Sequence, residues 1–162
     1  MIWQEDVFNI ILATFLGAAI GLERELSGKS AGLRTNLLIC LGASIFTIIS
    51  KRMVIGEEST TRIAAQIVTG VGFLGAGALI QDRRGVHGLT TAATIWLVAS
   101  IGMACGAGFR SLAIVSTIIA IIALTGLHRL ARPLEKHRKK NKTRHLPDDE
   151  DYLGDDRREI KE

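Results

Sequence analysis

Polar residues that could do chemistry gather at four points of this chain, and each point adjoins a long uncharged run. They are three triplets and one pair: Glu23, Arg24 and Glu25; Arg34, Thr35 and Asn36; Asp82, Arg83 and Arg84; Thr90 and Thr91. Carboxylates are the side chains that Mg²⁺ uses, normally one or two with several waters retained. The four points therefore form a candidate polar site. The alternative is that these charges only mark the ends of membrane spans and fix their orientation.

Ionisable groups at membrane depth are costly and tend to be paired. We therefore expect Glu23 or Glu25 to pair with Arg34 and to join the first two helices. The hydroxyls of Thr90 and Thr91 are suited to capping the start of a helix. Gln66 and Thr69, inside the third run, are expected to form interhelical hydrogen bonds rather than to bind a solute.

Five almost uncharged runs must position these groups. A hydrocarbon core about 30 Å thick needs roughly 20 helical residues, and a soluble helix would need a polar face that such runs do not provide. The sequence predicts an all-α polytopic membrane bundle of about five transmembrane helices over residues 1–130, followed by a disordered charged tail over residues 131–162. The runs cover residues 7–22, 37–50, 63–80, 89–109 and 112–127.

Basic residues predict the orientation of the bundle. Counted as far as Arg144, thirteen Lys and Arg fall on the side of Arg24 and of the basic segment, against four on the other side, and eight of the thirteen lie between Arg129 and Arg144. The excess places the N-terminus outside and the C-terminus in the cytoplasm. A basic segment followed by an acidic tail suits the anionic cytoplasmic leaflet, and it argues against nucleic acid as a partner.

Small residues recur at helical spacing inside the runs. Such stripes let helices approach closely, either within this chain or with another membrane protein or a second copy. Gly70, Gly72 and Gly75 also satisfy G-x-G-x-x-G, but the required strand and acidic residue are missing, so no nucleotide site is expected. Cys40 and Cys105 are expected to pack, without a disulfide or a metal. The packing glycines are Gly17 and Gly21, then Gly72, Gly75 and Gly77, then Gly102 and Gly106.

Several motifs together resemble the MgtC/SapB family of bacterial inner-membrane proteins, over about residues 7–127. They are Gly21-Leu22-Glu23-Arg24-Glu25, Gly32-Leu33-Arg34-Thr35, Arg62-Ile63-Ala64-Ala65-Gln66, Gly72-Phe73-Leu74-Gly75-Ala76-Gly77 and Gly88-Leu89-Thr90-Thr91-Ala92-Ala93. The resemblance implies about five spans and a link to growth under magnesium limitation. Longer members carry a folded C-terminal cytosolic domain, where this chain has a tail of about thirty residues that are mostly charged or polar.

Two functions follow from the resemblance and the residues. The first is a regulator or interaction protein in magnesium homeostasis or adaptation to low Mg²⁺. The second is a Mg²⁺ transporter or channel, although the middle of the spans offers only Thr, Ser, Asn and Gln as oxygen ligands. No catalytic constellation is expected, so an enzyme is not predicted. Mg²⁺ is compatible with the sequence as a ligand, but no metal site or cofactor can be derived from it.

Overall fold

The structure, a computed structural model, describes residues 2–53, 58–82 and 85–142, with side chains for residues 3–53, 64–79 and 85–126. The chain forms two compact units, residues 1–125 and residues 126–162. Five helices and a two-stranded hairpin make up the described residues: α1 (Ile2–Leu26), α2 (Leu33–Arg52), α3 (Glu58–Gly77), β1 (Ile80–Asp82), β2 (Gly85–His87), α4 (Leu89–Ala107) and α5 (Arg110–Lys142). The prediction of a bundle of five helices is confirmed.

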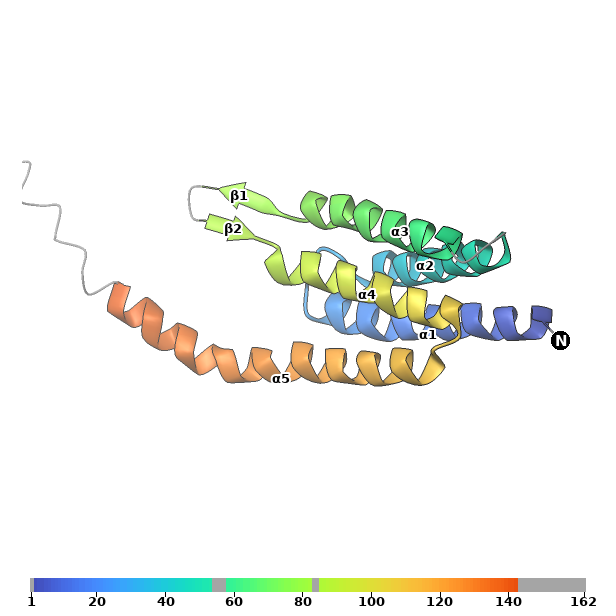
Figure 1. The fold of residues 1–162 in the computed structure, drawn as a ribbon. Coiled ribbons are helices and arrows are strands. Elements are labelled where there is room, and N and C mark those ends of the chain that lie inside the picture. The colour runs from blue at the N-terminus through green and yellow to red at the C-terminus, as the bar shows by residue number, and fades with distance from the viewer. Residues whose placement is uncertain (1, 54–57, 83–84, 143–162) are drawn as a thin grey trace, which may run out of the picture. The chain divides into compact units, whose positions relative to one another are not determined.

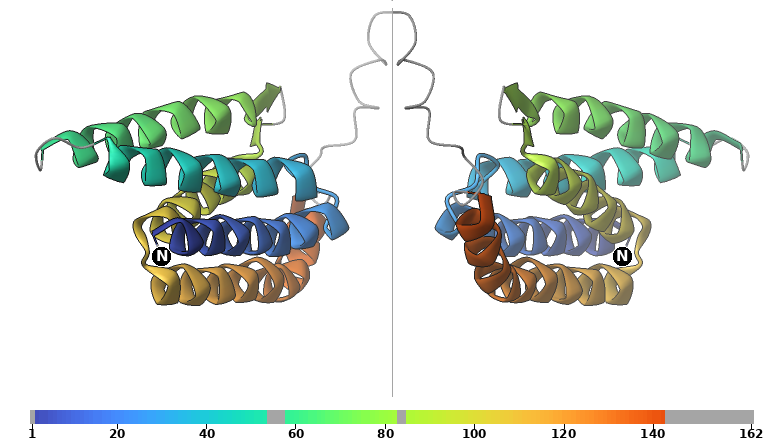
Figure 2. Two further views of the ribbon diagram at one scale, coloured as in Figure 1. Left: turned by 90° about the vertical axis from the view of Figure 1, so that its right-hand side faces the viewer. Right: turned by 90° about the vertical axis from the view of Figure 1, so that its left-hand side faces the viewer.

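The helices of the first unit lie side by side and successive ones run in opposite directions (Figures 1 and 2). In the described residues, three helices are long and apolar enough to cross a membrane, namely Trp3–Leu26, Leu33–Arg52 and Leu89–Ala107. The apolar parts of α3 and α5, Ala64–Gly77 and Arg110–Gly126, are shorter. Because the helices alternate, the C-terminus of α1 lies at the same end as the N-termini of α2 and α4. We call this the Glu23 end and the opposite one the Glu5 end.

Two helices, α2 and α4, form the centre of the core. One cluster of buried side chains joins them to α1 and to the first part of α5, which contributes Ala113 and Ala120. A second cluster joins them to α3, mainly through Val71. These buried side chains are small or medium-sized, so the helices approach closely, as membrane packing requires.

A short antiparallel hairpin connects α3 to α4. Its register pairs Ile80 with His87 and Asp82 with Gly85. The hairpin ends at Gly88, whose φ of +91° is in the left-handed region. A Cβ at Gly88 would lie 2.2 Å from the carbonyl oxygen of Ala78, so a side chain would obstruct the return into α4.

The helix α5 continues through the basic segment to Lys142. The sequence predicts a boundary near residue 130 and a disordered tail beyond it. The helical part therefore extends further than the composition suggests. Residues 143–162 of the expected tail lie outside the described residues.

Candidate functional site

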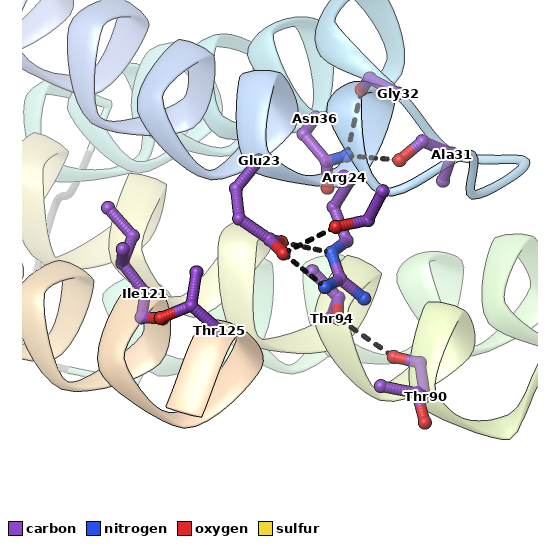
Figure 3. Close-up of polar contacts among 10 residues, drawn as sticks. Glu23, Arg24, Ala31, Gly32, Asn36, Thr90, Thr94, Ile121 and Thr125 are labelled. Carbon is purple, nitrogen blue, oxygen red and sulfur yellow. Dashed lines mark hydrogen bonds and ion pairs between the residues drawn. The ribbon is translucent and has the colours of Figure 1, made fainter. Parts of the chain in front are cut away.

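A buried ion pair lies at the Glu23 end of α1. Arg24 donates two hydrogen bonds to the carboxylate of Glu23, from Nε to Oε2 at 2.5 Å and from Nη2 to Oε1 at 2.8 Å (Figure 3). Their side chains are only 4% and 12% exposed. Ser27 Oγ donates a further bond of 2.8 Å to Glu23 Oε1. Because both charges are removed from solvent, each stabilises the other in the buried site.

The end of α1 and the turn that follows present these groups. Gly28 has a φ of +65°, and Lys29 N donates to Arg24 O at 3.0 Å, which closes a Schellman-type helix end. Glu25 then reaches back to the next helix: its Oε2 accepts a bond of 2.7 Å from Leu33 N. A carboxylate at a helix N-terminus is stabilised by free N–H groups and by the helix dipole. Glu25 thus caps α2, whose N-cap residue Gly32 has no side chain to do so.

Asn36 secures the same turn from inside α2. Its Nδ2 donates to Ala31 O at 2.7 Å and to Gly32 O at 2.8 Å (Figure 3), and the residue is fully buried. Its Oδ1 has no hydrogen-bond partner among the described residues. An unpaired buried oxygen is costly and suits a small donor such as water. Asn36 therefore leaves one acceptor free in the polar region at this end.

The helix α4 brings threonines to the same end of the bundle. Thr91 and Thr94 are buried, and Thr94 Oγ1 donates to Thr90 O at 2.8 Å. The prediction that Thr90 and Thr91 cap α4 is wrong, because the N-cap position is occupied by Gly88 without a side-chain cap. Both threonines already lie in the first turn of the helix, and Thr91 faces inward.

The predicted pairing of Glu23 or Glu25 with Arg34 is also wrong. Glu23 binds Arg24, Glu25 caps α2, and Arg34 and Thr35 are exposed. The physical reason is the tight turn after α1, which brings Glu25 to the backbone N–H of Leu33 rather than to the Arg34 side chain. Asp82 lies in β1, and its side chain is outside the described ones.

The glycine stripes of α1 and α4 both face α2. A Cβ at Gly17 would lie 2.6 Å from Cys40 Cβ, and a Cβ at Gly21 would lie 2.8 Å from Leu33 Cα. On α4, a Cβ at Gly102 or Gly106 would lie 2.2 or 2.4 Å from a carbonyl oxygen of α2. These stripes are therefore covered by the chain's own α2. For these four glycines, the alternative of packing within the chain is confirmed.

The glycines of α3 have a different environment. A Cβ at Gly75 would lie 3.7 Å from Ala92, whereas Gly72 and Gly77 have nothing within 4 Å. The three glycines of the dinucleotide-like pattern lie inside this helix, without the strand-to-helix turn that pattern needs. Thr69 donates to Ala65 O of its own helix at 3.0 Å, so the expected interhelical bond is not formed by Thr69. Gln66 is exposed.

The Glu5 end holds a second set of pairs, which the sequence reasoning did not anticipate. Arg52 of α2 binds Asp6, and Arg110 of α5 binds Glu5 and, at 2.8 Å, Asn9 Oδ1. The same guanidinium groups lie over aromatic rings of α1, at 4.6 Å from the Trp3 centroid and 4.7 Å from the Phe8 centroid respectively. The sequence does contain a signal for these pairs. Acids lie at the start of the chain, and arginines lie at the end of α2 and at the start of α5. This end ties α2 and α5 to α1.

Comparisons with known proteins identify relatives over most of the chain. Residues 10–133 match the family model described as the MgtC family. Protein MgtC of Brucella abortus (strain 2308) is 47% identical over 123 residues, which cover 76% of this chain and 51% of that protein. Protein MgtC of Salmonella typhimurium (strain 14028s / SGSC 2262) is 44% identical over 130 residues, which cover 80% and 55%.

A relative from Escherichia coli (strain K12) is named putative magnesium transporter YhiD. It is 42% identical over 149 residues, which cover 88% of this chain and 67% of that protein. The chain thus spans about half to two thirds of the length of these curated relatives. No solved structure matches.

Proposed function

The chain belongs to the MgtC family, and on that premise we propose that it is a multi-pass inner-membrane protein that regulates or binds another membrane protein during adaptation to low Mg²⁺. The magnesium link rests on the name of the Escherichia coli relative, putative magnesium transporter YhiD. The proposed role is not enzymatic, and the bilayer is the proposed environment for the apolar helices.

The contacts of the two acids at the Glu23 end favour regulation over transport. Glu23 is bound by a buried guanidinium, and Glu25 caps α2. Both carboxylates therefore stabilise the fold in this conformation rather than offering free oxygens to a divalent cation. In addition, residues 7–22, 37–50, 63–80, 89–109 and 112–127 contain no Asp or Glu. Among the described residues, no group of three or more His, Cys, Asp or Glu could hold a metal.

A deletion strain grown with and without Mg²⁺ tests this proposal. Wild type should restore growth in low Mg²⁺, whereas Arg24→Gln should not, because it removes the charge that balances Glu23 in the buried site. Arg34→Gln is the matched control, since Arg34 is exposed at the same end of the bundle. Equal growth of the deletion strain and wild type in low Mg²⁺ would contradict the magnesium link.

Transport of Mg²⁺ is the second candidate, favoured by the name of the Escherichia coli relative. Proteoliposomes that hold the purified full chain and a Mg²⁺-sensitive dye separate the two functions. The regulatory proposal expects no uptake above that of empty liposomes. Uptake that requires Glu23 and saturates with Mg²⁺ would contradict the regulatory proposal and support transport.

A further inference from the structure

A groove lies between α2 and α3, and its lining includes none of the covered glycines of α1 and α4. Its volume is about 650 Å³, and its walls include Leu38 and Phe46 of α2 and Leu74 of α3. Gly42 and Gly70 also line it, and a Cβ at either glycine would meet nothing within 4 Å. The groove is thus an open apolar surface at which another helix could approach the backbones of both α2 and α3.

One polar side chain lines this apolar groove. Gln66 is exposed, and within the described part of the chain it forms no hydrogen bond. It lies inside the apolar segment Ala64–Gly77, one helical turn after Arg62. Lipid tails cannot bond to an amide, and an unsatisfied polar group in hydrocarbon is costly. The groove therefore favours an occupant that supplies both a donor and an acceptor at the depth of Gln66.

We propose that this occupant is a second copy of the chain, joined α3 to α3 about a two-fold axis along the membrane normal. Such an axis places Gln66 of both copies at the same depth. A glutamine amide carries donors and an acceptor, so the two amides can form reciprocal hydrogen bonds. Gly70, one turn further along the same face, lets the two backbones approach closely.

The neighbouring apolar surface fits the same arrangement. Phe73 is 82% exposed and follows Gln66 by seven residues, so both lie on one side of α3. In the dimer, Phe73 of each copy is covered by the partner copy. The glycines of α1 and α4 cannot serve in this way, because α2 already covers them.

The test is single-molecule photobleaching of the labelled full chain in liposomes, over a series of protein-to-lipid ratios. Wild type should show two-step bleaching at ratios where Gln66→Leu and Gly70→Leu show one step, with about a tenfold weaker association in each variant. Gly70→Leu should keep its helical content, because the added side chain enters open space.

Gly72→Leu is the matched control. It places the same side chain on the same helix, also where nothing lies within 4 Å, but outside the groove, and it should dimerise like wild type. One-step bleaching of wild type at every ratio would overturn the proposal and leave lipid or a different protein as the occupant. Unchanged dimerisation of Gly70→Leu would overturn it as well. Neither outcome depends on a magnesium phenotype.

Discussion

At the scale of single residues, Arg24 is the group whose environment departs most from that of an ordinary membrane-flanking charge. It is 3% exposed, and its guanidinium binds the carboxylate of the residue next to it. Neighbouring residues of a helix normally point in different directions. Their convergence here occurs at the last turn of α1, and it lets two opposite charges be buried side by side.

The buried pair leads to a prediction about stability. Arg24→Gln should lower the free energy of unfolding by about 3 kcal/mol, because it leaves the Glu23 carboxylate without its guanidinium. The double variant Glu23→Gln/Arg24→Gln should lose less unfolding free energy than Arg24→Gln, since it removes both charges of the pair together. Thermal unfolding in detergent, followed by circular dichroism, measures both. Arg34→Gln serves as the control, and an equal loss in all three variants would contradict the role of the pair.

At the scale of elements, α2 is the helix on which the packing of the first unit depends. Glycines of α1 and α4 contact its backbone and Cys40, and Glu25 of α1 caps its first turn. Lys51 near its other end donates a bond of 3.0 Å to Ala107 O, which lies at the C-terminus of α4. Close packing along α2 stabilises the association of the helices, because the hydrophobic effect does not drive helix association in lipid.

Packing against α2 predicts that substitutions at Gly102 and at Gly72 have very different effects on stability. Gly102→Leu should destabilise the protein by roughly 1–3 kcal/mol or more, because its Cβ alone would lie 2.2 Å from Cys40 O. Gly72→Leu should have little effect, because its Cβ meets nothing within 4 Å. Melting temperatures of the two variants test this directly. Similar melting temperatures would show that α2 and α4 can separate without cost.

At the scale of the whole molecule, the alternating helices put two different polar surfaces at opposite ends of the bundle. The Glu23 end holds the buried pair and the cap of α2, and the Glu5 end holds the pairs of Arg52 and Arg110. The orientation of these ends in the membrane is predicted from the basic segment. Up to residue 128, five Lys and Arg lie on the side of the Glu23 end and four on the side of the Glu5 end, so the eight between Arg129 and Arg144 decide the predicted orientation.

Reporter fusions test that orientation. Green fluorescent protein at the C-terminus should fluoresce, and alkaline phosphatase inserted after Met53 should be active, because the first is expected in the cytoplasm and the second outside. Replacing the eight basic residues by Gln should produce a mixture of orientations. A single unchanged orientation in that variant would show that the tail does not decide it.

The sequence by itself predicted the five helices and a membrane environment for them, because the cost of placing charge in hydrocarbon acts on each segment separately. It also predicted packing glycines, since small residues at helical spacing are a local pattern. Only the tertiary structure decided that Glu23 binds Arg24, that Glu25 caps α2 and that α2 covers both stripes of α1 and α4. Those contacts depend on where each helix ends and how it is rotated. Both properties come from packing between segments far apart in the chain.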